Sequence, residues 1–170
     1  MSLKNKFRLP SYRTPLFLAL ASMILCLSVR LLSKTPLDLL HSLQSEDVLP
    51  PLWLFNLFSL AWSLFIGFAA GIVACEVISG RAHGRREILV YQGGLLFVAV
   101  IILSNVWYPV FFSCGRPVVA CLIALVTAVP SSLCAIIWAR VSAVSGVILG
   151  AYSLWLTYVL FLNVSIIFHL

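Results

Sequence analysis

Five long apolar runs constrain this chain more than any other feature, because each is long enough to cross a bilayer. A hydrocarbon core about 30 Å thick requires roughly 20 residues of helix. Backbone polar groups in lipid must be satisfied internally, so only helices or closed barrels cross, and these runs lack the alternation of a barrel strand. We therefore predict an all-α integral membrane protein, a five-transmembrane-helix bundle. Its helices are expected at about residues 15–32, 52–77, 88–107, 118–138 and 144–168.

The composition agrees with a membrane protein. The 170 residues are 62% hydrophobic and 9% charged, whereas soluble chains carry about 25% charged residues. A net charge of +6 would favour nucleic acid as the partner of a soluble protein. Here the basic residues lie at the edges of the apolar runs, so we expect a lipid bilayer and no nucleic acid.

The chain divides into a basic N-terminal tail, residues 1–14, and a single membrane domain, residues 15–170. With five spans, the tail, the loop 79–87 and the turn at Arg140 share one side of the membrane. The basic residues on that side are Lys4, Lys6, Arg8, Arg13, Arg81, Arg85, Arg86 and Arg140. Those on the other side are Arg30, Lys34 and Arg116. The positive-inside rule then predicts a cytoplasmic N terminus and a C terminus outside.

Few side chains in the spans could carry catalytic chemistry. No Asp, Glu or Lys lies well inside a span, and Arg30 is near a helix end, where we expect it to snorkel to the interface. The histidines His41, His83 and His169 are scattered, which does not favour a metal site. We predict no catalytic residue, no metal ligand and no resident cofactor.

Aromatic and amide side chains near the helix ends serve either as an interfacial belt or as the lining of a ligand pocket. Tyr152 and Trp155 are three residues apart and share a helix face, and Asn163 lies eight residues further, close to that face. An amide deep in a span needs a partner in the protein or in a ligand. An apolar pocket with a few indole and amide donors would suit a planar aromatic or tetrapyrrole ligand.

Three motifs follow one another along most of the chain. The second run opens with two prolines, a nearby tryptophan and a glycine midway: Pro50, Pro51, Trp53 and Gly67. The third run ends with Leu103, Trp107, Pro109, Phe111 and Phe112. The fifth run carries Tyr152, Trp155, Leu162 and Asn163. In these motifs the chain resembles a divergent member of the TspO/MBR family, the translocator proteins and tryptophan-rich sensory proteins, which are five-helix membrane proteins.

The chain departs from the family pattern at several polar positions. The asparagine usual in the third helix is Ser104 here, and Asn105 follows it, about 100° around the helix. A tryptophan usual in the second helix is Ser59, with Trp62 displaced from that position. These departures concern the ligand pocket more than the fold.

The resemblance implies a membrane receptor or carrier that binds porphyrins, haem-related tetrapyrroles or similar hydrophobic ligands, in transport or in stress or regulatory signalling. The ligand would lie in a cavity within the bundle, capped by residues 33–48. The candidate ligand-binding residues are Trp53, Ser104, Trp107, Tyr152, Trp155 and Asn163.

Other interpretations remain open. The chain is alternatively a membrane scaffold or accessory subunit that has kept the fold and lost tetrapyrrole binding. Porphyrin degradation, attributed to some bacterial members, rests on the resemblance alone, so we do not predict an enzyme. Family members are often dimeric, and Gly67-x-x-x-Gly71 and Gly146-x-x-x-Gly150 serve either packing within one bundle or a homodimer seam.

Overall fold

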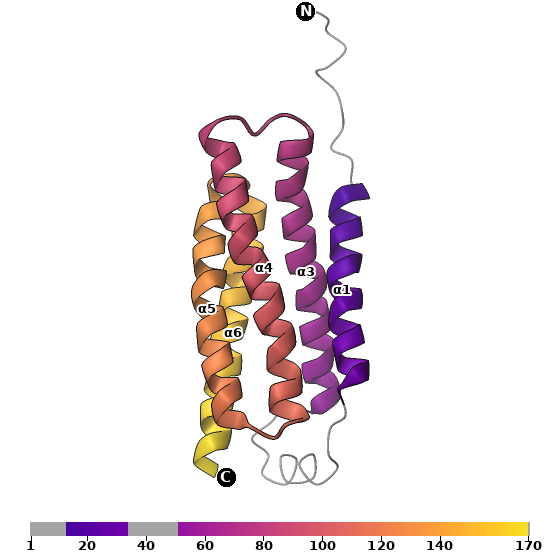
Figure 1. The fold of residues 1–170 in the computed structure, drawn as a ribbon, viewed down its shortest axis with the longest axis vertical. Coiled ribbons are helices and arrows are strands. Elements are labelled where there is room, and N and C mark those ends of the chain that lie inside the picture. The colour runs from indigo at the N-terminus through magenta and orange to yellow at the C-terminus, as the bar shows by residue number, and fades with distance from the viewer. Residues whose placement is uncertain (1–12, 34–50, 170) are drawn as a thin grey trace, which may run out of the picture.

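The computed structural model describes residues 13–33 and 51–169, and long helices form nearly all of this part of the chain (Figure 1). The helices are α1 (Arg13–Leu32), α3 (Leu52–Ile78), α4 (Arg85–Phe112), α5 (Pro117–Ala139) and α6 (Ala143–His169). All five are long and apolar enough to cross a membrane, and the described residues contain no strand. The predicted five-helix membrane bundle is confirmed. The predicted basic tail and the cap at residues 33–48 lie almost wholly outside the described residues.

Prolines mark where two helices begin. Pro51 precedes the first turn of α3 as its N-cap, and Pro117 is the first residue of α5. A proline is harmless there because the first N–H groups of a helix have no intrahelical partner. Gly80, Gly84 and Gly115 have positive φ in the connections on either side of α4, a conformation that glycine adopts without a steric penalty.

Helix α4 is longer than the apolar run that predicts it. It extends through Pro109 to Phe112, whereas the sequence predicts an end near Trp107. Pro109 cannot donate to the carbonyl four residues earlier. The amides of Ser113 and Cys114 nevertheless donate to the Pro109 carbonyl at 2.9 and 3.0 Å, so the last turn closes.

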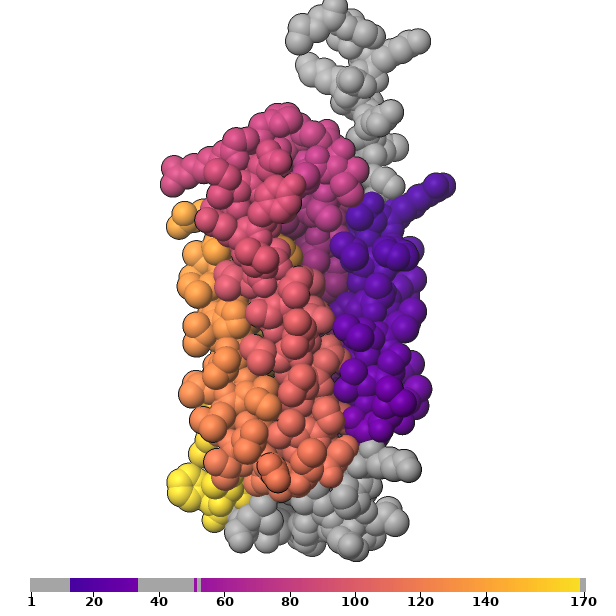
Figure 2. All heavy atoms as spheres, in the orientation of Figure 1, coloured from indigo at the N-terminus to yellow at the C-terminus, as the bar shows by residue number. Residues whose placement is uncertain are grey.

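The helices pack as neighbours in an order that differs from the chain order. Helix α1 lies along α3, α3 also contacts α6, α6 lies along α5, and α5 lies along α4 (Figure 1). Although α3 and α4 are consecutive, they contact one another only slightly, as do α1 and α4. Figure 2 shows α4 (pink) and α1 (indigo) next to one another on one face of the molecule.

Glycines bring α1 and α3 close together. A Cβ atom on Gly67 would lie 2.5 Å from the carbonyl oxygen of Leu18, and one on Gly71 would lie 2.2 Å from the Cα atom of Pro15. These two glycines therefore pack against α1 within the bundle, the first of the two alternatives that the sequence leaves open. Gly146 similarly packs against Ala139.

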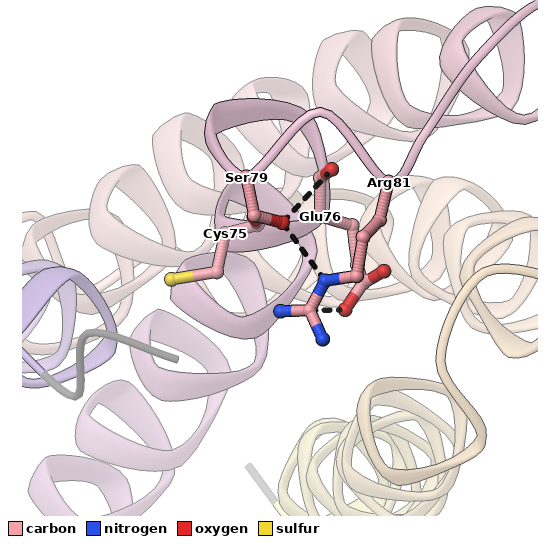
Figure 3. Close-up of polar contacts among 4 residues, drawn as sticks. All are labelled: Cys75, Glu76, Ser79 and Arg81. Carbon is pink, nitrogen blue, oxygen red and sulfur yellow. Dashed lines mark hydrogen bonds and ion pairs between the residues drawn. The ribbon is translucent and has the colours of Figure 1, made fainter. Parts of the chain in front are cut away.

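Basic side chains are concentrated at the end of the bundle where α1 begins and where α3 connects to α4. Arg13, Arg81, Arg85 and Arg86 lie in these segments, and the turn at Arg140 is at the same end. Arg81 contacts the C-terminal end of α3 (Figure 3). Its Nε donates to Ser79 Oγ at 2.9 Å, and its Nη2 lies 3.6 Å from Glu76 Oε1. The Ser79 hydroxyl also donates to the Cys75 carbonyl at 2.6 Å, in the last turn of α3.

Candidate functional site

A cavity opens between the helices in the half of the bundle away from this basic end. Residues spaced by three, four and seven line it, because that spacing keeps side chains on one helix face. Helix α3 contributes Phe55, Ser59, Trp62, Ser63 and Ile66. Helix α4 contributes Ile101, Ser104, Asn105, Trp107 and Tyr108, and α6 contributes Tyr152, Trp155, Leu156 and Val159. The remaining lining residues are Cys26, Val29 and Arg30 of α1 and Ala124 and Thr127 of α5.

Aromatic rings from three helices meet at this cavity. The Phe55 ring centre lies 5.8 Å from that of Trp107 and 5.7 Å from that of Trp155. Further along α3, the Trp62 ring centre lies 5.9 Å from that of Tyr152. These separations are typical of aromatic packing. The cavity therefore has aromatic side chains of α3, α4 and α6 in its walls.

Most hydroxyl and amide groups of the lining already have protein partners. Ser104 Oγ and Tyr152 Oη are 2.7 Å apart and join α4 to α6. Asn105 Nδ2 donates to the Ile101 carbonyl at 2.8 Å, within its own helix. The indole N–H of Trp107 is buried and has no acceptor among the described residues. A ligand would thus meet aromatic faces and few free donors.

Arg30 lines this cavity near the end of α1 and has partners on two neighbouring helices. Its Nη1 donates to the side-chain oxygen of Asn56 and lies 3.4 Å from the Asn56 carbonyl oxygen. Its guanidinium carbon lies 4.5 Å from the centre of the Tyr108 ring, a cation–π contact. These partners on α3 and α4 hold the guanidinium between the helices, and the neighbouring Nε is buried without an acceptor among the described residues.

Four of the six candidate residues come together at the cavity: Ser104, Trp107, Tyr152 and Trp155. Trp53 does not line it, since its side chain is 67% exposed. It lies two residues before Phe55, about 200° away around α3, where it faces outward in the manner of an interfacial anchor.

Asn163 is 1% exposed and lines a separate void of about 10 Å³, together with Trp107. Its Nδ2 donates to the Val159 carbonyl at 2.7 Å, and its Oδ1 has no partner among the described residues. Asn163 therefore lies beside this small void with Trp107 and does not line the main cavity.

Several lining residues are not among the six candidates predicted from the sequence. Phe55 lies four residues before Ser59 and seven before Trp62, so helical spacing alone places all three on one face. Trp62 and Asn105, which the family pattern marks as displaced, also line the cavity. These lining residues are identified by the helix face on which they lie, and not by their match to a motif position.

The cavity has a volume of about 60 Å³. That is room for a few water molecules and far below the roughly 300 Å³ at which small-molecule sites begin. A tetrapyrrole would therefore enter only if side chains and helices moved apart.

An apolar groove of about 690 Å³ adjoins the cavity, between α1, α3 and α4. Leu25 and Gly67 line the groove, and the residues next to them in sequence, Cys26 and Ile66, line the cavity. Ile101 lines both. The groove is open towards the surroundings of the bundle, and it lies beside the cavity with Ile101 as a shared wall.

Comparison with known proteins agrees with the architecture and with the motifs. The profile of the TspO/MBR family matches residues 15–169, nearly the whole chain. No curated protein and no solved structure gives a significant match. The match covers all five helices, including α1, which carries none of the three motifs. On this evidence the chain belongs to the TspO/MBR family.

Proposed function

We propose that this protein is a TspO-like membrane receptor or carrier that binds porphyrins or related hydrophobic ligands in the cavity between its helices. The observation that carries the proposal is the convergence of Phe55, Trp107 and Trp155, from three different helices, on one cavity. Flat aromatic surfaces bind a planar conjugated ring by offset stacking. Membership of the TspO/MBR family supports the same ligand class.

The adjoining groove supports a route from the bilayer. A hydrophobic ligand concentrates in lipid, and the groove between α1, α3 and α4 is lined almost wholly by apolar side chains. Since α1 and α4 contact one another only slightly, a small displacement of α1 would widen the passage. A ligand would then pass Ile101, which lines both spaces.

A binding role fits the lining better than catalysis does. The described residues around the cavity include no carboxylate, histidine or lysine that could act as a general base. We therefore propose reversible binding, in transport or signalling, without chemical conversion of the ligand.

The proposed orientation has the N terminus in the cytoplasm and the C terminus outside. Its support is the concentration of arginines at the end formed by the α1 start and the α3–α4 connection. A reporter enzyme fused to the C terminus tests it. Activity confined to the cytoplasm would contradict the orientation.

Titration of the detergent-purified protein with protoporphyrin IX tests the ligand. The protein has five tryptophans, and Trp155→Phe and Trp53→Phe each remove one, the first inside the cavity and the second outside it. We expect saturable quenching of tryptophan fluorescence, with affinity lowered several-fold by Trp155→Phe and unchanged by Trp53→Phe. Weak, non-saturating quenching in all three proteins would contradict ligand binding and favour the scaffold interpretation.

A further inference from the structure

We propose that the ligand of this cavity is an organic anion, an amphipathic planar molecule with a carboxylate, and that Arg30 is the residue that pairs with it. The inference rests on the proposed function and deepens it, because it names the charge that the ligand must carry.

The Arg30 guanidinium lies among the residues that line the cavity. Arg30 is in the last turn of α1 and, among the residues that line the cavity, it is the basic one. Asn56 accepts from one of its terminal nitrogens, while the Tyr108 ring covers one face of the group. Both partners are neutral, so they orient the guanidinium without neutralising its charge.

The described part of the chain places no carboxylate beside Arg30. Within residues 13–33 and 51–169 the one ion pair joins Arg81 and Glu76, at the opposite end of the bundle. No carboxylate lines the cavity in this part of the chain. A charged side chain within a membrane bundle is costly and commonly marks a ligand or ion site. A bound carboxylate would offset that cost.

Among the described residues, the Arg30 guanidinium keeps a free donor that suits a carboxylate. Guanidinium groups bind carboxylates with two parallel N–H donors, and the Arg30 Nε–H has no acceptor among the described residues. Trp107 directly precedes Tyr108 on α4, and its ring stacks on Phe111 at a centre separation of 5.2 Å and lies near Phe55. A ligand with its acid at Arg30 would therefore place its planar body along the aromatic wall.

Comparing protoporphyrin IX with its dimethyl ester tests the inference, since the two share the ring and differ in charge. Binding is measured in the same detergent, with the partition of each compound into empty micelles subtracted. We expect the wild-type protein to bind the diacid about tenfold to a hundredfold more tightly than the ester, the range of a charge-assisted hydrogen bond. Arg30→Gln should bring the two affinities together, and Arg30→Lys should keep part of the preference.

Arg116→Gln is the matched control, because Arg116 is exposed at the same end of the bundle and lies outside the cavity lining. It should leave the preference for the diacid unchanged. Equal binding of diacid and ester by the wild-type protein, which requires no variant to fold, would overturn the role of Arg30 and leave the proposed function standing. Failure of both compounds to bind would overturn the proposed function and this inference with it.

Discussion

Replacing Gly93 with alanine should destabilise the bundle, although alanine is the better helix former. A Cβ atom at Gly93 would lie 2.1 Å from Trp138 Nε1 and 2.3 Å from Trp138 Cδ1. The indole is 3% exposed and stacks on Phe97 at 5.3 Å, so it has little room to withdraw. Relieving the clash would move the ring by roughly 1 Å, and such overpacking costs about 1–3 kcal/mol. The gain in helix propensity offsets up to about 1 kcal/mol.

The adjacent glycine supplies the matched control. Nothing lies within 4 Å of a Cβ atom on Gly94, so Gly94→Ala should be neutral or stabilise by up to about 1 kcal/mol. Reversible unfolding in mixed micelles would measure both variants. We expect Gly93→Ala to lower the free energy of unfolding by about 1–3 kcal/mol relative to Gly94→Ala, because both variants gain the same helix propensity. Equal stability of the two variants would refute the packing of Trp138 against Gly93.

Three further predictions concern packing and ligand access. Ser104→Ala and Tyr152→Phe should each lower the free energy of unfolding by about 1–3 kcal/mol. Because the two side chains share one hydrogen bond, the double variant should lose less than the sum of the two single losses. Additive losses would contradict this hydrogen bond. Ile101→Trp should slow porphyrin association in stopped-flow fluorescence several-fold while changing the equilibrium affinity less, and an unchanged rate would exclude entry past that residue. Gly71→Leu should loosen α1 and lower the thermal unfolding temperature, whereas Gly150→Leu, with nothing within 4 Å of its Cβ position, should not.

The fold was predictable from the sequence because the bilayer imposes strong constraints on apolar runs. Each run had to become one helix, and the polar turns between them had to face water. The end of α4 was not predictable from hydropathy, since Pro109 reads as a helix breaker. Tertiary packing decides this case, because Tyr108, Phe111 and Phe112 are buried and hold the last turn in place.

The candidate site was predictable where residues lie on one face of one helix. Tyr152 and Trp155 meet this condition, and both line the cavity. Trp53 was predicted to line the cavity because the motif gives its position in the chain. The motif does not say which face of α3 points inward, and in the structure that face carries Phe55. The place of Arg30 in the cavity lining was not predicted, because the direction of a long side chain near a helix end depends on neighbours distant in sequence, here Asn56 and Tyr108.

An experimental structure of the protein determined with protoporphyrin would show where the ligand binds. We expect a ring between Phe55, Trp107 and Trp155, with the helices displaced enough to enlarge the cavity of about 60 Å³. A porphyrin found on the lipid-facing surface, with the aromatic rings still closed on one another, would contradict it.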